Sequence, residues 1–374
     1  MGKIELDHTG SGSGITLSSD GTDLLLDGTA IGGGGGAALE LYAENPVSAV
    51  TPIATGNNSI SIGSNSQAAS TNGNSIAIGT TARATGNASA AFGGNFPNAS
   101  AAGSLALGYT PTASGAFSAA IGYDAKAVGD SSVAFTKSYA GGTSSFAAAI
   151  ANNTSSYGAT GANSIAMGYQ AKATGLYGVA IGYTAITTGS YSVSLGGTAS
   201  ASRTAALGQG GIASHDDAVS LGYGRSNFEG HVTYTTGFDG GKAQLGMVVL
   251  RSETSDATPK ALTVANQAAS TDNQIILPDN SAFAFHGTIV ARQQASGGTA
   301  SAAWKIEGLI RREGSAGTTV LVNSATTVLD NTPGWGLALS ADTTNGGLAI
   351  TVTGAAATNI RWVATIHTSE VTYA

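Results

Sequence analysis

The sequence predicts an all-β protein in which a stack of short, repeated β-coils is followed by an antiparallel β-sandwich. Three observations lead to this prediction: a five-residue pattern that recurs about every 14 residues, glycine at 55 of the 374 positions, and charged residues at only 10% of positions. Segments of this kind contain few helix formers and many turns. Mean hydropathy is slightly positive at +0.11, and we therefore expect the chain to fold.

The repeat consists of a serine, an apolar residue, an alanine, a second apolar residue and a glycine. Ten clear copies end at Gly63, Gly79, Gly93, Gly108, Gly122, Gly168, Gly182, Gly196, Gly208 and Gly222. Two weaker copies, ending at Thr136 and Ala151, fill the long gap and complete about twelve coils of about 14 residues. A shorter element lies between the copies, as in residues 82–86 and 171–175. Each coil is thus expected to hold two short strands and two turns.

Strand geometry divides each repeat into a large face and a small face. In one copy Ile76 and Ile78 point to one side and Ala77 to the other, because side chains alternate along a strand. A coil of this length has little room inside and cannot bury its apolar face alone, so neighbouring coils must supply contacts above and below. Glycine at the strand end suits a turn with positive φ or a close approach of backbones.

The charge distribution indicates self-association of the middle of the chain. Residues 1–59 carry one lysine and seven acidic residues, residues 60–222 carry five basic and four acidic residues, and residues 223–374 carry nine and eleven. A long segment with so little charge is expected to present a surface that associates with another chain. No region is basic enough to bind nucleic acid.

Other compositional features exclude several classes of site. Cysteine is absent, so no disulfide framework or thiolate metal site is expected. Residues 1–14 lack the pattern of a secretory leader, and no run reaches the roughly 18 apolar residues that span a bilayer. We therefore expect no membrane insertion.

Two copies, Asn74–Gly79 (NSIAIG) and Asn163–Gly168 (NSIAMG), carry a family resemblance. Residues 56–222 resemble the head repeat of trimeric autotransporter adhesins, the YadA-type head, whose hallmark is NSxAIG followed by AxAxG. The resemblance implies a left-handed parallel β-roll that packs as an intertwined homotrimer. We expect no counterpart of that family's coiled-coil stalk, since no heptads are seen, and none of its membrane anchor. The same repeat occurs in phage tail fibres, which need neither.

The segments before the roll resemble attachment elements of virion proteins. Residues 1–31 look like the small β-repeats that attach phage structural proteins to a particle, with two short strands around the turn Asp20-Gly21. Residues 32–55 are expected to form a glycine-rich linker and a short connector. Within them, residues 37–44 are expected to form a short helix that ends before Pro46.

Residues 223–374 have a different composition and contain all three tryptophans. Long alternating runs and the hairpin signal Asn345-Gly346 predict an antiparallel β-sandwich of jelly-roll type. Strands are expected near residues 243–250, 273–277, 282–292, 301–312, 318–323, 335–340, 347–353 and 359–373. This domain resembles the C-terminal tip domains of phage fibres.

The search for catalytic or cofactor motifs favours a protein that is not an enzyme and has no cofactor. The run of residues 32–37 satisfies G-x-G-x-x-A but lacks the following helix of a dinucleotide site, and residues 238–243 lack the glycine and hydroxyl residues of a P-loop. His215, Asp216 and Asp217 form the densest titratable cluster. A solvated turn is the favoured interpretation, although three copies at a trimer axis could hold a metal ion. His8, His231, His286 and His367 are scattered, with no metalloprotease spacing and no catalytic triad.

Five tyrosines directly follow a strand-ending glycine, and neighbouring copies are therefore expected to stack along one edge of the roll. They are Tyr109, Tyr123, Tyr169, Tyr183 and Tyr223. A ladder that stiffens the turns is the favoured interpretation. The alternative is a strip that binds saccharides.

Together these expectations describe a structural fibre of a virion, such as a phage tail fibre, whose trimeric tip contacts the host. Its expected partners are two further copies of itself, other virion proteins through the N-terminus, and a host-surface glycan or protein through residues 223–374. The expected location is the virion, and the extracellular space after release. The alternatives are a fragment of a bacterial trimeric surface adhesin and, less favoured, a polysaccharide-degrading tailspike, which would need clustered carboxylates.

Overall fold

The computed structural model describes residues 50–148, 156–237 and 241–373, together with the backbone of five short strands before residue 50. The chain divides into two compact units, residues 1–144 and 145–374. These described parts contain strands and one short 3₁₀-helix, η1 (Ala316–Thr318), but no α-helix. No helix within them is long and apolar enough to cross a membrane.

The first four strands form a small antiparallel sheet. In order, they are β1 (Ile4–Leu6), β2 (Ile15–Ser19), β3 (Leu24–Leu26) and β4 (Thr29–Ala30). Strands β2 and β3 pair with Leu17 opposite Leu26, which confirms the two strands expected on either side of Asp20-Gly21.

The helix expected over residues 37–44 is wrong where the structure describes this segment. Leu39–Leu41 form strand β5, which pairs in parallel with the first long strand of the roll. Its Leu-Glu-Leu sequence has the alternation of a roll strand, and pairing with the roll overrides helix propensity here. The remaining residues of that segment lie outside the described part.

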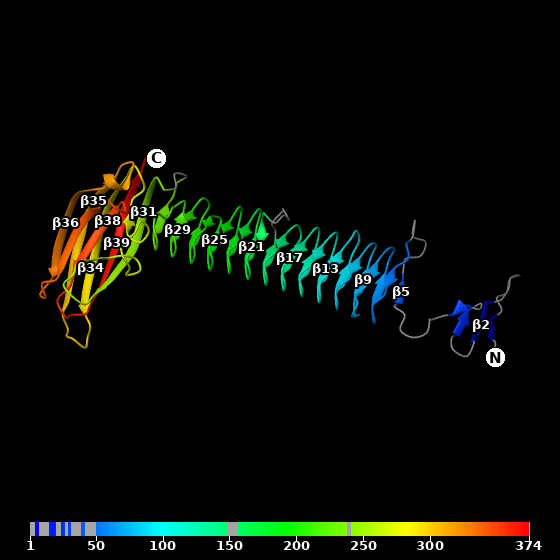
Figure 1. Cartoon of the computed structure of the whole chain (residues 1–374). Helices are drawn as coiled ribbons and strands as arrows, with labels where there is room; N and C mark the ends of the chain where they lie inside the picture. Colours follow the sequence, from blue (N-terminus) through cyan, green and yellow to red (C-terminus); the bar gives the residue numbers. More distant parts are fainter. Residues whose placement is uncertain are drawn as a thin grey trace. The chain divides into compact units, whose positions relative to one another are not determined.

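The first unit contains a parallel roll with one sheet of three-residue strands and one of two-residue strands (Figure 1). The long strands that follow β5 are β7 (Ile60–Ile62), β9 (Ile76–Ile78), β11 (Ala90–Phe92), β13 (Leu105–Leu107), β15 (Ala119–Ile121) and β17 (Val133–Phe135). The short strands are β6 (Ile53–Ala54), β8 (Gln67–Ala68), β10 (Arg83–Ala84), β12 (Asn98–Ala99), β14 (Thr112–Ala113), β16 (Lys126–Ala127) and β18 (Tyr139–Ala140).

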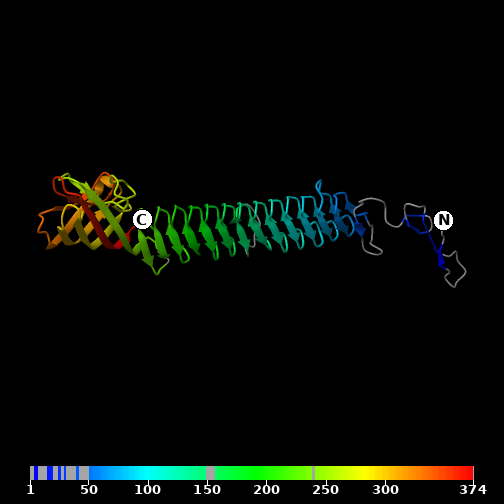
Figure 2. The same cartoon turned by 90° about the horizontal axis from the view of Figure 1, so that it is seen from below.

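The second unit contains the same two kinds of strand (Figure 2). Its long strands are β19 (Phe146–Ala148), β21 (Ile165–Met167), β23 (Val179–Ile181), β25 (Val193–Leu195), β27 (Ala205–Leu207), β29 (Val219–Gly222) and β30 (Val232–Thr235). Its short strands are β20 (Gly158–Ala159), β22 (Lys172–Ala173), β24 (Ile186–Thr187), β26 (Thr198–Ala199) and β28 (Ile212–Ala213).

The interior of the roll consists almost entirely of alanine and serine. In one coil Ser75 and Ala77 from the long strand side, and Ala82 and Ala84 from the short strand side, have no exposed surface. Buried serines return their hydroxyl hydrogen bond to the turn just before them, as when Ser164 Oγ donates to the carbonyl of Gly161 at 2.6 Å. Small side chains are required because a 14-residue coil leaves no space for larger ones.

Glycines at the strand ends allow the coils to stack. Gly79 has a φ of +126° and leads out of β9. A Cβ at this position would collide with the carbonyl oxygen of Gly93 in the next coil, while the amide of Gly93 donates to the carbonyl of Ile78 at 2.9 Å. The glycine is thus required both for its conformation and for the closeness of the next backbone.

The structure changes the expected repeats in two places. The weak copy expected over residues 147–151 is wrong, because the strand there is β19, in which Ala147 lies opposite Ala166 and Phe146 opposite Ile165. In this register the position of the repeat glycine is residue 149, which is an alanine, and the missing glycine hid the correct alignment. The roll also extends beyond Gly222, since β30 pairs in parallel with β29.

The larger sheet of the C-terminal sandwich has the order β31-β39-β34-β35-β36 and is antiparallel. Its strands are β31 (Ala243–Thr254), β34 (Ser281–Gln293), β35 (Ser301–Arg312), β36 (Val320–Asp330) and β39 (Ile360–Thr372). Strand β31 also pairs with β30, the last parallel strand. This antiparallel pairing ends the roll.

The smaller sheet is built around β38 (Gly347–Thr353). It pairs with β37 (Gly336–Asp342) on one side and with β32 (Lys260–Ala261) and β33 (Ile275–Ile276) on the other. The expected hairpin at Asn345-Gly346 is confirmed, with Asp342 opposite Gly347. The antiparallel sandwich expected after the roll is therefore present, with strands close to the expected positions.

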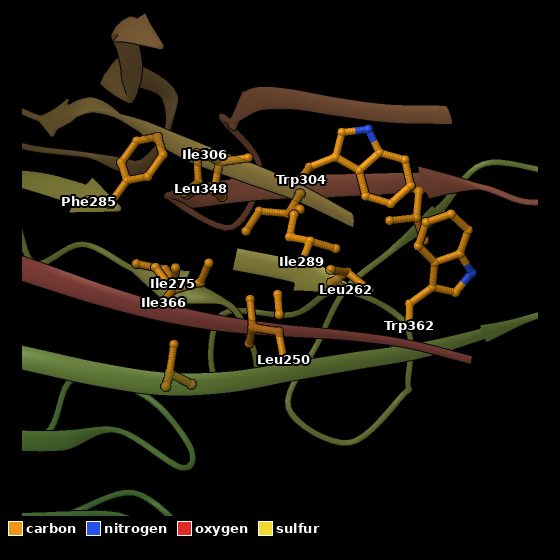
Figure 3. Close-up of a cluster of buried hydrophobic side chains, with 14 of the residues drawn as sticks. Leu250, Leu262, Ile275, Phe285, Ile289, Trp304, Ile306, Leu348, Trp362 and Ile366 are labelled. Atoms are coloured by element: carbon orange, nitrogen blue, oxygen red, sulfur yellow. The ribbon is translucent and has the colours of Figure 1, made fainter. Parts of the chain in front are cut away.

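A single hydrophobic core lies between the two sheets (Figure 3). Trp304 and Trp362 stack with ring centroids 5.8 Å apart, and Trp335 packs against Trp362 at a tilt of 58°. The indole nitrogen of Trp362 donates to Thr254 Oγ1 at 3.0 Å, which satisfies the one polar group of this ring inside the core. Leu250, Ile289 and Leu348 complete its centre.

Strand β36 differs from the others because nearly all of its residues are exposed, on both faces. It pairs with β35 along one edge only. Val328 and Leu329, whose side chains point to opposite faces, are 57% and 53% exposed. Apart from Asp330, the strand carries no charged residue and no proline, two of the features that keep an edge strand from pairing with another chain; its pairing with β35 shifts register at two places.

Candidate self-association and binding surfaces

The large apolar residues of the repeat point outward from the roll. In the second unit Leu195 and Leu207 lie opposite each other on adjacent strands and are 47% and 36% exposed. The residues just before them, Ser194 and Ala206, are fully buried. Other outward residues of these strands are also exposed: Leu107 and Phe135 in the first unit, and Ile165, Met167, Ile181 and Val193 in the second. Each unit therefore presents a column of large apolar side chains that its own chain does not cover.

The tyrosines after the strand-ending glycines stack in pairs. Tyr109 and Tyr123 in the first unit have ring centroids 5.6 Å apart, and Tyr169 and Tyr183 in the second are 5.4 Å apart. These four side chains are about half exposed. Tyr223 stands apart from this pair, because Gly197 and Gln209 occupy the equivalent position in the two coils between, and its ring lies against Gly210.

A second aromatic pair, Tyr177 and Tyr191, lies along the turns before the long strands. Their rings are 5.0 Å apart, and the amide of Tyr191 donates to the carbonyl of Leu176 at 2.8 Å. Sequence reasoning missed them, although both follow the glycine of the shorter element by two residues. Aligning the shorter elements, rather than only the longer ones, would have placed these tyrosines one above the other.

In the next coil, Arg203 occupies the turn position equivalent to Tyr177 and Tyr191. It forms a charged group with Asp216 and Asp217. Arg203 donates from Nε to Asp217 Oδ1 at 2.6 Å and from Nη2 to Asp217 Oδ2 at 2.9 Å. The hydrogen bond from Arg203, with its charge, lowers the pKa of Asp217 below its usual value. Asp216 accepts from the amide of Ser202 at 2.9 Å.

In the structure, the side chains of His215, Asp216 and Asp217 therefore do not meet at a common position where they could bind one ligand. The ring of His215 turns away, with Nε2 3.6 Å from Asp272 Oδ1, and Arg203 occupies the two carboxylates. Among the residues that the structure describes, no three histidine, aspartate or glutamate side chains are arranged to hold a metal ion. Burial and the neighbouring carboxylates of Asp217, Asp272 and Asp216 raise the pKa of Glu229 beside this cluster.

Two of the histidines that look scattered in the sequence are neighbours in the fold. His286 on β34 lies directly opposite His367 on β39, and their rings stack 5.3 Å apart. His231 is fully buried and contacts Glu370 at 3.0 Å. Because strand register is unknown from sequence, neither pair was predictable.

Glu370 is the centre of a buried polar network between the last coil and the sandwich. Gln244 Nε2 donates to Glu370 Oε2 at 2.7 Å, and Thr368 Oγ1 donates to Oε1 at 2.6 Å. A buried carboxylate needs such partners to offset the loss of water. The network therefore connects His231, just before β30, and Gln244 on β31 to β39.

Five segments of the chain match the model of the YadA head domain repeat, at residues 54–73, 70–95, 113–135, 159–185 and 173–199. All five fall within the roll, and they confirm the resemblance based on Asn74–Gly79 and Asn163–Gly168. The chain therefore contains YadA-type head repeats folded as a parallel β-solenoid.

No curated protein sequence is significantly similar to the chain as a whole. Among solved structures, it is similar to tailspike protein gp49 of the Acinetobacter baumannii bacteriophage Fri1, which is described as a capsular polysaccharide depolymerase. The identity is 11% and the TM-score 0.23, over 87% of this chain and 50% of that one. This chain thus corresponds to half the length of that protein, and a TM-score this low carries no argument about fold or function.

Proposed function

We propose that the chain is the subunit of a homotrimeric virion fibre, a phage tail fibre or similar appendage, which presents the C-terminal sandwich to a host surface. The observation that carries this proposal is the column of outward-facing apolar residues on YadA-type repeats. A soluble monomer would expose this column to water, whereas packing against two further copies would bury it. Three copies of the sandwich would then raise avidity without a strong single site.

Strand β36 independently supports self-association. Its apolar residues, such as Val322 and Val328, are exposed on a strand with an unpaired edge, an arrangement that soluble monomers normally avoid. Contact with a second copy would cover either the edge or one of the faces. The small N-terminal sheet is proposed to attach the fibre to other virion proteins, which places the fibre on the virion and, after release, outside the cell.

The first test is the mass of the purified chain by light scattering after size exclusion. We expect three times the 36.5 kDa of the chain. The double variant L195D/L207D should lose the trimer, because two charges per chain would be buried. The control Q209D adds a charge at an exposed turn of the same coil and should remain trimeric. A folded wild-type monomer, or a double variant with unchanged mass, would refute the proposal.

We further propose that the fibre is not an enzyme. Among the described residues, Arg203 holds Asp217 in a bidentate ion pair and lies 3.6 Å from Asp216, so neither of these two carboxylates is a free acid of the kind that glycoside hydrolysis requires. Release of oligosaccharides from host capsular polysaccharide by the purified chain would contradict this and favour a tailspike. A bacterial surface adhesin would share the roll and the trimer. Binding of residues 223–374 to animal cells, but not to bacteria, would favour that alternative.

A further inference from the structure

The outer face of the larger sheet carries a row of charges across three strands. Glu253 on β31 lies opposite Arg361 on β39, and Arg361 lies opposite Arg292 on β34. Arg361 Nε donates to Glu253 Oε1 at 2.8 Å, and Arg361 Nη2 lies 2.6 Å from the same oxygen. The row therefore consists of one negative and two positive charges, and its single carboxylate is paired with the middle residue, Arg361.

Two positive charges at this end of the sheet have only uncharged partners among the hydrogen bonds of the described residues. Arg292 donates from Nη1 to the carbonyl oxygens of Thr299 and Ala300. Lys260 donates to the carbonyl of Glu253 at 3.1 Å and to Asn266 Oδ1 at 2.8 Å. Like charges directly opposite each other on neighbouring strands are destabilising, so the pair formed by Arg292 and Arg361 favours an anion near Arg292.

These charges line a groove with a volume of about 920 Å³, the size of a site for a small ligand. Val290 and Val363, which are opposite each other on β34 and β39, contribute apolar surface to it. Side-chain amides are close by: Asn359 Nδ2 donates to Gln294 Oε1 at 2.9 Å, and Gln293 and Asn266 also line the groove. Amides suit sugar hydroxyls, and two adjacent valines suit the C–H face of a sugar ring.

We propose that this groove binds an anionic saccharide, with Arg292 and Lys260 facing the acidic group and the amides facing hydroxyls. This deepens the proposed function, on which it rests, by naming the ligand class that the tip recognises. A nucleic acid fits less well, because the groove offers three cations and one carboxylate within a chain of net charge −7, whereas phosphate backbones are bound by many more basic residues. The acidic group can be a sugar carboxylate or a phosphodiester of a glycan.

The test uses the intact fibre and calorimetric titration with three probes: tetragalacturonate for a carboxylate, a glycerol phosphate oligomer for a phosphodiester, and neutral maltotetraose. We expect one of the two anionic probes to bind, and the stronger one identifies the source of the charge. The double variant R292Q/K260Q should weaken binding at least tenfold. The matched control is K305Q, which removes a charge from the same sheet at Lys305, outside the groove.

Binding should also weaken as salt is raised, because exposed charges are screened. Unfolding temperatures should be compared, so that a loss of binding is not a loss of folding. The inference is refuted if neither anionic probe binds, if maltotetraose binds equally well, or if K305Q is as harmful as the double variant. A trimeric fibre that attaches to host cells but gives any of these results would leave the proposed function standing and remove the groove from it.

Discussion

Replacing Gly79 by alanine is the most direct test of how the roll is held together. The residue has a φ of +126°, and its added Cβ would meet the carbonyl oxygen of Gly93. The next coil cannot move away without losing ladder hydrogen bonds such as that from the amide of Gly93 to Ile78 at 2.9 Å. Both the positive φ and the collision are therefore expected to lower the free energy of unfolding.

The expected loss follows from two contributions. A non-glycine residue in such a strained conformation costs about 1–3 kcal/mol, and overpacking a tightly packed site costs about 1–3 kcal/mol. Together they lower the free energy of unfolding by about 2–6 kcal/mol. At roughly 2–4 °C per kcal/mol, the Tm should fall by at least about 4 °C.

The assay is thermal unfolding followed by circular dichroism, at one protein concentration because the chain is proposed to associate. The matched control is G94A, which places a methyl group in the equivalent turn of the next coil, at a position with no heavy atom within 4 Å. It should change stability by less than about 0.5 kcal/mol. If G79A and G94A unfold at the same temperature, close backbone stacking is not what requires glycine.

Three further predictions concern the roll interior, a hairpin and the charged cluster. Replacing the fully buried Ala166 by leucine should cost about 1–3 kcal/mol in thermal unfolding, whereas M167L on the outward face should cost less than about 0.5 kcal/mol; equal effects would contradict an interior of small residues. Burial alone would raise the pKa of Asp342, but hydrogen bonds from Gln274, Asn345 and Thr344 outweigh it and lower this pKa below 3.8. Its contribution to stability is therefore present above pH 4 and is lost as the pH falls through the lowered value. D342N should destabilise by about 1 kcal/mol at pH 7 in denaturant unfolding, and this difference should shrink as the pH falls below 3.8; a loss independent of pH would refute this. The raised pKa of Glu229 means that folding favours its protonated form. E229Q should therefore raise the Tm at pH 7 and lose this advantage below pH 4. A lower Tm of E229Q at pH 7 would contradict this reasoning.

Much of the roll was predictable because each coil repeats the same local solution. Asn74–Gly79 contains the whole pattern: a serine and an alanine that fit inside, large residues that alternate with them, and a glycine that stacks. The prediction was wrong over residues 147–151 because an alanine takes the place of the repeat glycine there, so the residue that marks the alignment is missing. It was also wrong at Leu39–Leu41, where pairing with β7 decides the structure.

The surfaces were harder to predict, because they depend on which residues face each other across strands. The sequence placed four tyrosines correctly into stacked pairs, since their spacing equals the length of a coil. It could not show that Arg292 lies opposite Arg361, or His286 opposite His367, because these residues are about 70 and 80 positions apart and their register is set by the packing of the sandwich. The binding roles of all these residues stay predictions.

The stacking of Ala166 on Ala180, and of neighbouring coils within each unit, also affects how such proteins can change. Because every coil receives and offers nearly the same surface, gain or loss of one 14-residue unit would leave the remaining contacts intact and alter the length by about 4.8 Å, the spacing of paired strands. The reach of the proposed fibre could thus be adjusted genetically in small steps, with the sandwich unchanged. The antiparallel pairing of β31 with β30 is what makes this possible, since it ends the series at the same junction however many coils precede it.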